Sequence, residues 1–226
     1  MLMALVWKEW LKLRSAFLVL LTIHLAMNGW AVASLRSLFS GAHPEALWYQ
    51  AAILGNIYFD MLRHLPWISG LILAAAQHLP EIRGKRLRLT LHLPVRTEAA
   101  MACSVLFGAA MFLFLAGLDA TIILTAGAIR YPAEIVTTHL WALLPMQAAG
   151  LAAYFGASTV LFEPSTSRKL HLGLLAIAAT GMLLIPVRPG AWNTSEALIL
   201  GLVLMAALAV TPFLAMTRQR LTGKNQ

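Results

Sequence analysis

The sequence predicts an all-α membrane protein, a bundle of about six transmembrane helices that follows a short amphipathic helix at the membrane surface. Three observations support this fold class. First, 60% of the 226 residues are hydrophobic, only 12% are charged, and the mean hydropathy is +0.76. A soluble domain carries roughly twice that charged fraction. Second, the apolar residues form six long runs, and third, Lys and Arg gather on alternate connections between those runs.

Composition also limits the domain organisation and the partners. The low charged fraction extends along the whole chain, so we expect residues 1–226 to form a single transmembrane domain. The net charge is +8, and its placement beside the apolar runs favours membrane orientation and lipid contact over nucleic-acid binding. Cys103 is the only cysteine and lies within an apolar run, which excludes a disulfide framework and a cysteine-built metal site.

Residues 1–14 are predicted to form an interfacial helix. At about 100° per residue, Trp7 and Trp10 share a broad apolar face, whereas Lys8, Glu9 and Lys12 fall on the other face. We expect the tryptophans at headgroup level and the lysines towards the cytoplasm or anionic lipid. The alternative is that the first span begins early and the charged residues only flank it.

Six segments have the length of about 20 apolar residues that a hydrocarbon core of about 30 Å requires. The second and fifth are short. Because residues 121–129 are also apolar, the third either runs longer or folds back at the outer surface. The six segments are approximately 15–35, 62–79, 99–118, 138–161, 170–187 and 196–216.

The basic residues predict the orientation of these spans. Thirteen of the 17 lie on connections that six spans place on one side, and four lie on the other. Since Lys and Arg favour the cytoplasmic side, we expect both termini, including the tail 217–226, in the cytoplasm. The 13 are Lys8, Lys12, Arg14, Arg83, Lys85, Arg86, Arg88, Arg96, Arg168, Lys169, Arg218, Arg220 and Lys224, and the four are Arg36, Arg63, Arg130 and Arg188.

The longest outer segment is residues 37–60. Pro44 and Glu45 are suited to begin a helix there. That helix would lie on the surface, re-enter the membrane, or extend the second span outward, with Pro66 as a kink or as the first turn of that span.

Several polar residues lie in or near the spans. Asp60, Arg63 and His64 fall within one helical turn, so the carboxylate can pair with either base. This group would contact a polar substrate or serve as a solvated interfacial anchor. Asp119 is expected at the outer interface, because it lies about 20 residues beyond Glu98 on the inner side. A buried position for Asp119 requires a longer third span.

Gln147 is a more interior polar group, in the fourth span. It is suited to hydrogen-bond across helices, and Pro145 is a candidate kink. Small residues that follow allow a neighbouring backbone to approach, which suits intramolecular packing as well as a subunit interface. They are Ala149, Ala153 and Ala157, with Ala152 and Gly156 beside them.

No catalytic, cofactor-binding or metal-binding motif is present. The patterns GxxxxGK[ST], HExxH and GxSxG do not occur. Histidines 24, 64, 78 and 139 are not spaced at i,i+3 or i,i+4 from another His or Cys, which gives little support to a metal or haem site. We therefore predict that the chain is not an enzyme.

The connection 80–98 combines charges with a run of leucines. A loop that only orients the protein needs the charges but not the leucines. We expect a short helix over about 83–92 at the membrane surface that offers a basic face to a cytoplasmic partner. The charged and glycine residues of interest are Glu81, Arg83, Gly84, Lys85, Arg86 and Arg88.

Three features together resemble the membrane subunit of ABC-2 type transporters. The start MLMALVWKEWLKLR looks like the interfacial elbow helix of that family. The stretch PEIRGKRLRLTLHLPVRTE is similar to the family's acidic, basic and glycine residues followed by leucines and a turn into the third span. The third feature is the six-span layout with both termini inside. In this chain Arg83-Gly84-Lys85-Arg86 stands where many members place a glycine followed by Thr or Ser and another acid.

The resemblance implies a permease subunit in a bacterial cytoplasmic membrane that moves a substrate or transmits force. It would pair with a second copy or paralogue and bind separate ATPase subunits, which would hold ATP and Mg²⁺. Residues 81–88 would be the coupling element, although the same basic residues also suit a topology signal that touches lipid phosphate. Two alternatives are a membrane anchor or scaffold without transport, and an intramembrane enzyme or haem- or metal-handling protein.

Overall fold

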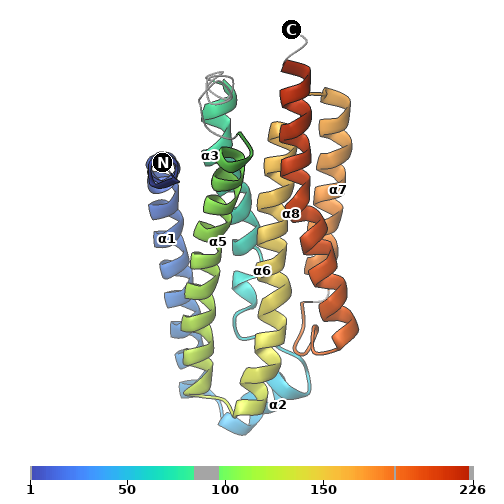
Figure 1. The fold of residues 1–226 in the computed structure, drawn as a ribbon. Coiled ribbons are helices and arrows are strands. Elements are labelled where there is room, and N and C mark those ends of the chain that lie inside the picture. The colour runs from blue at the N-terminus through green and yellow to red at the C-terminus, as the bar shows by residue number, and fades with distance from the viewer. Residues whose placement is uncertain (1, 84–96, 186, 224–226) are drawn as a thin grey trace.

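The computed structural model describes residues 2–83, 97–185 and 187–223, and every regular element in these ranges is helical (Figure 1). The all-α prediction is therefore confirmed for the described part of the chain. The helices are α1 (Leu2–Gly41), α2 (Pro44–Ala52), α3 (Leu65–Arg83), α5 (Thr97–Ala128), α6 (Ala133–Phe162), α7 (Thr166–Leu184) and α8 (Ser195–Gly223), with one 3₁₀ turn at Asp60–Leu62.

Four of these helices are long and apolar enough to cross a membrane: α1, α5, α6 and α8. They identify a multi-pass membrane protein. The predicted second and fifth spans overlap α3 and α7, but these 19-residue helices are not among those long and apolar enough to cross a membrane. Four of the six predicted spans are therefore supported among the described residues.

The six helices of 19 residues or more lie side by side and alternate in direction (Figure 1). Both α1 and α5 begin at the end of the bundle that holds the chain termini, whereas α6 and α8 begin at the opposite end. Helices α3 and α7 run between these two ends and connect them.

Helix α6 is central to the packing, because α3, α7 and α8 all pack against it. Its backbone approaches α3 most closely where two glycines meet. A Cβ atom added at Gly70 would lie 2.1 Å from the backbone oxygen of Gly150. Large apolar side chains cover the outer surface instead, for example Leu174 on α7 and Val203 on α8, which are about 60% exposed, as lipid contact requires.

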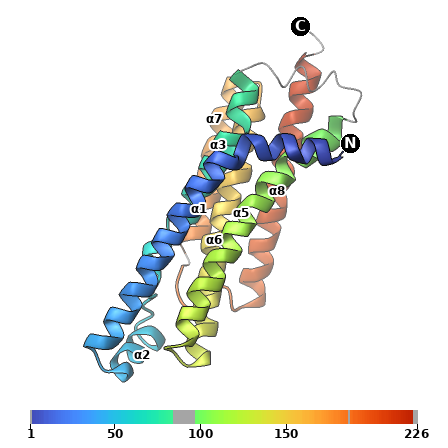
Figure 2. The same ribbon diagram turned by 90° about the vertical axis from the view of Figure 1, so that its left-hand side faces the viewer.

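The first 14 residues do not form a separate helix, because α1 continues without a break from Leu2 to Gly41. Figure 2 shows that its first turns bend away from the axis of the rest of the helix. Trp7 points outward and is 61% exposed, as expected for the apolar face. The charged face was expected to point away from the protein, but Glu9 on that face is only 4% exposed and points into the bundle. Helical periodicity fixes which residues share a face, but not which face packs against the protein.

Two other predictions about element ends can be compared with the structure. A helix does begin at Pro44, and Pro66 lies in the first turn of α3, where a proline costs no hydrogen bond. Helix α5 extends to Ala128, about ten residues beyond the predicted end of the third span. Asp119 therefore lies within the helix and is buried, with 1% exposure, which decides between the two positions that the sequence allowed.

Candidate functional site

Two clusters of polar side chains, most of them buried, lie inside the bundle, and both are built from α1, α3, α5 and α6. The mid-bundle cluster consists of His24, Asn28, Ser69, Asp119 and Gln147. The Glu9 cluster consists of Lys8, Glu9, Lys12, Gln77, Glu81, Ser104 and Tyr154. Ionisable groups inside a membrane protein are costly to bury, so they mark the first places to look for function.

The Asp119 carboxylate is the centre of the mid-bundle cluster. One of its oxygens accepts hydrogen bonds from His24 Nδ1 at 2.9 Å and from Asn28 Nδ2 at 2.6 Å. The other accepts from Gln147 Nε2 at 3.3 Å. Three donors from two neighbouring helices thus hold one carboxylate of α5. The predicted hydrogen bond of Gln147 across helices is confirmed.

The hydrogen bonds of His24 assign its tautomer. A carboxylate only accepts, so Nδ1 carries the proton that faces Asp119. The other ring nitrogen, Nε2, lies 2.9 Å from Ser69 Oγ. A neutral imidazole accepts there from the hydroxyl, whereas an imidazolium donates to it. The Ser69 hydroxyl can satisfy either charge state of the ring.

These contacts follow the order of a serine hydrolase triad, with Ser69 as nucleophile, His24 as base and Asp119 as orienting acid. Accessibility argues against that chemistry. Ser69 is 0% exposed and His24 1%, so the hydroxyl meets neither water nor lipid in this arrangement. A nucleophile also needs hydrogen-bond donors for the oxyanion that forms beside it. Ser69 precedes Gly70, where α3 packs closely against α6, so a substrate would have little space there.

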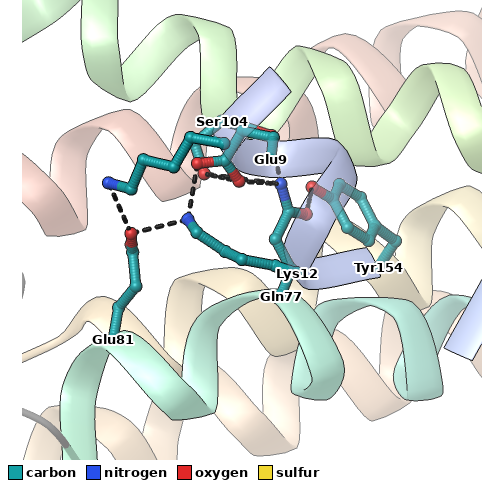
Figure 3. Close-up of polar contacts among 7 residues, drawn as sticks. Glu9, Lys12, Gln77, Glu81, Ser104 and Tyr154 are labelled. Carbon is teal, nitrogen blue, oxygen red and sulfur yellow. Dashed lines mark hydrogen bonds and ion pairs between the residues drawn. The ribbon is translucent and has the colours of Figure 1, made fainter. Parts of the chain in front are cut away.

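The Glu9 cluster lies nearer the end of the bundle that holds the termini, because its residues come from the first turns of α1 and the last part of α3. Figure 3 shows its side chains. Lys12 of α1 contacts two carboxylates, with its Nζ 2.5 Å from Glu9 and 2.6 Å from Glu81 of α3. Lys8 pairs with Glu81 at 3.0 Å. Two lysines and two glutamates balance in charge, which lowers the cost of burying them.

Glu9 and Gln77 extend the same cluster towards α5 and α6. The Gln77 amide donates at 2.9 Å to Glu9 and at 2.6 Å to the backbone oxygen of Ser104. Its carbonyl accepts from the Tyr154 hydroxyl at 2.8 Å. Figure 3 shows these side chains converging from all four helices. The cluster therefore fixes the bent start of α1 to the rest of the bundle.

Glu81 had been predicted as part of a cytoplasmic coupling loop, but it lies in the last turns of α3 and is 6% exposed. The ammonium groups of Lys12 and Lys8 lie 2.6 and 3.0 Å from its carboxylate and offset the cost of burying this charge. Glu81 is thus an internal ion-pair partner of α1.

The rest of the predicted coupling element lies at or beyond the end of α3. Arg83 is the last residue of α3, and Gly84, Lys85, Arg86 and Arg88 lie outside the described residues. Their proposed contact with a partner stays a prediction. The predicted tail 217–226 begins inside α8, where Arg218 pairs at 2.9 Å with the buried Glu163 at the end of α6.

The predicted outer cluster is partly assembled. Asp60 and Arg63 form an ion pair at 2.5 Å, and both side chains are at least one third exposed. His64 contacts Trp67 instead, accepting from its Nε1 at 3.1 Å. Asp119 and Gln147, the other two polar candidates in the predicted spans, belong to the mid-bundle cluster.

His24, Asn28 and Ser69 were not singled out as site residues. A signal for the first two exists, since polar side chains four residues apart within an apolar run share one helix face. Ser69 offers no comparable signal. Within the described ranges, no group of three or more His, Cys, Asp or Glu side chains is placed to hold a metal ion.

Comparison with protein-family models, with curated proteins and with solved structures finds no match for this chain. The functional argument therefore rests on the residues and on their arrangement.

Proposed function

We propose that this chain is the permease subunit of an ABC-2 type transporter, which moves a substrate or transmits force across a bacterial cytoplasmic membrane. ATP and Mg²⁺ would be bound by a separate ATPase on the cytoplasmic side. A second copy or a paralogue would complete the membrane part.

One observation carries the proposal. The two segments on which the family resemblance rests, the amphipathic start and the stretch from Pro80, are 69 positions apart yet joined by the contact of Lys12 with Glu81. A force applied just after Arg83 would reach α1 through this ion pair and α6 through Gln77 and Tyr154. Coupling between a cytoplasmic partner and the membrane helices requires such a contiguous connection.

Helix directions support six crossings in this proposal. Since α1 and α5 run in the same direction, the chain must return between them, and α3 is the segment that does so. The same reasoning applies to α7, which returns the chain between α6 and α8. Short spans of 19 residues suit a bilayer that thins locally or helices that lie nearly upright.

Co-purification from native membranes tests the partner. A tagged full-length chain is expected to bring down a protein that contains a Walker A loop and hydrolyses ATP. Replacing Arg83, Lys85 and Arg86 together with Ala should reduce that association at least five-fold without changing membrane insertion. Replacing Arg36, Arg130 and Arg188, three basic residues at the opposite end, is the matched control. Equal association in both variants would remove the coupling role from residues 83–86.

The contacts among Ser69, His24 and Asp119 favour a second candidate, an intramembrane hydrolase. A fluorophosphonate probe in native membranes distinguishes it, because the probe reacts only with an activated serine. We expect no labelling, since Ser69 is fully buried. Labelling that disappears in Ser69→Ala would favour the hydrolase over the permease. If the chain is a scaffold without transport, we expect neither labelling of Ser69 nor co-purification of an ATPase.

A further inference from the structure

A groove runs along the bundle between α3 and α7. Both helices pack against α6, which forms the floor, and they make little contact with each other. The groove has a volume of about 570 Å³, which lies within the range of about 300–1,000 Å³ that is usual for ligand pockets. On α7 the lining extends from Gly173 to Leu184, which corresponds to a length of about 16 Å.

Small and apolar side chains line the groove, which is why it stays open. Ala157 of α6 and Gly173 and Gly181 of α7 contribute little volume. At Gly181, no atom lies within 4 Å of the place where a Cβ would be. Among the described residues that line the groove, Thr180 provides the only hydroxyl and none is charged. A polar substrate would find almost no hydrogen-bond partner here, whereas a hydrocarbon chain needs none.

One end of the groove is cationic. Trp67 and Leu184 line this end, beside the contact of Arg63 Nη2 with the backbone oxygen of Val187 at 3.4 Å. Arg188 follows Val187 and is exposed. Asp60 neutralises one of the two arginines, so one positive charge remains.

We propose that this groove holds one acyl chain of an anionic phospholipid, whose phosphate is bound by Arg63 and Arg188. The lipid satisfies both parts of the site, because the chain fills the apolar groove and the phosphate pairs with the arginine charge that Asp60 leaves unneutralised. A helix of a second copy would cover the apolar part but would leave that positive charge without a partner. The inference depends on the membrane location of the bundle and not on an ATPase partner.

Native mass spectrometry of the full-length chain tests the acyl-chain site. The protein is purified in mild detergent with equal amounts of phosphatidylglycerol and phosphatidylcholine of identical chains. We expect one retained lipid per chain, mainly phosphatidylglycerol. Gly181→Leu fills the groove and should lower retention at least five-fold. Gly117→Leu is the matched control, since Gly117 of α5 also has open space around it but lies outside the lining.

A second pair of variants tests the headgroup. Arg63→Gln should reduce the preference for phosphatidylglycerol over phosphatidylcholine about five-fold, as expected for one basic residue near a lipid surface. Arg36→Gln, an exposed arginine at the same end of the bundle, should not. Equal retention in Gly181→Leu and Gly117→Leu overturns the proposal. So does a dimer that dissociates in Gly181→Leu without any retained lipid, because the occupant is then a second copy.

Discussion

At the scale of single residues, Asp119 has three side-chain partners to lose. In Asp119→Ala, His24 Nδ1, Asn28 Nδ2 and Gln147 Nε2 would lose their common acceptor. Each hydrogen bond is worth about 0.6–1.7 kcal/mol in a membrane protein. We expect the free energy of unfolding in mixed micelles to fall by about 2–4 kcal/mol.

Asp60→Ala is the matched control for Asp119→Ala, because Asp60 is an exposed aspartate in an exposed ion pair. Its loss should change the same free energy by about 0.5 kcal/mol or less. Asp119→Asn keeps the size and one acceptor oxygen and should fall between the two. Equal effects of Asp119→Ala and Asp60→Ala would mean that the mid-bundle cluster does not stabilise the fold.

The sequence allowed part of this site to be predicted. Gln147 was recognised as an interior polar group because it stands inside an apolar run. The partnership of His24 with Asp119 could not be predicted, since the two residues are 95 positions apart and meet only through the packing of α1 on α5. The position of Asp119 depended on the length of α5, which apolar composition alone left open.

At the scale of helix pairs, the close approach of α3 to α6 depends on glycine. Gly70→Ala would place a Cβ against the backbone oxygen of Gly150, so the two helices would have to move apart. We expect a loss of at least about 2 kcal/mol in the free energy of unfolding, as for other overpacked interfaces. Gly29→Ala in α1 is the control, because nothing lies within 4 Å of that position.

Gly29→Ala should be neutral or stabilise by up to about 1 kcal/mol, since alanine favours the helix. A Gly70→Ala variant as stable as Gly29→Ala would show that α3 and α6 are not in close contact in the membrane. The sequence had directed attention to the alanine stripe of α6. The glycine contact was missed because a single Gly in an apolar run has no pattern that marks its partner.

The bent start of α1 is held to α3 by the ion pair of Lys12 with Glu81. A double-mutant cycle with Lys12→Ala and Glu81→Ala should give a coupling energy of about 1–2 kcal/mol, because both side chains are largely buried. Lys8 with Glu81 should couple more weakly, since the Lys8 side chain is 40% exposed. Equal coupling for the two lysines would contradict the geometry of the cluster.

The partnership of Lys12 with Glu81 could not be predicted from the helical wheel, because the wheel placed Glu9 and Lys12 together on a face assumed to meet the cytoplasm or lipid. The two residues are 69 positions apart and meet through the packing of α1 on α3.

Over the whole molecule, the alternation of helix direction makes the topology testable through single cysteines. With Cys103 replaced by Ser, cysteines are introduced at Glu45, Arg130, Arg168 and Arg188, all of which are exposed. Labelling by an impermeant maleimide is measured in sealed right-side-out vesicles. Six crossings predict that positions 45, 130 and 188 are labelled and that 168 is protected until the vesicles are opened.

Each pair of labelled positions tests whether one of the two short helices, α3 or α7, crosses the membrane. Labels at both 45 and 130 require the chain to cross back between α1 and α5, and α3 is the segment available for that crossing. Opposite results at 168 and 188 require α7 to cross, because it is the helix between them. Labelling of 168 and 188 from the same side would mean that α7 does not span the bilayer. The groove between α3 and α7 would then face water at one end and could not hold an acyl chain along its length.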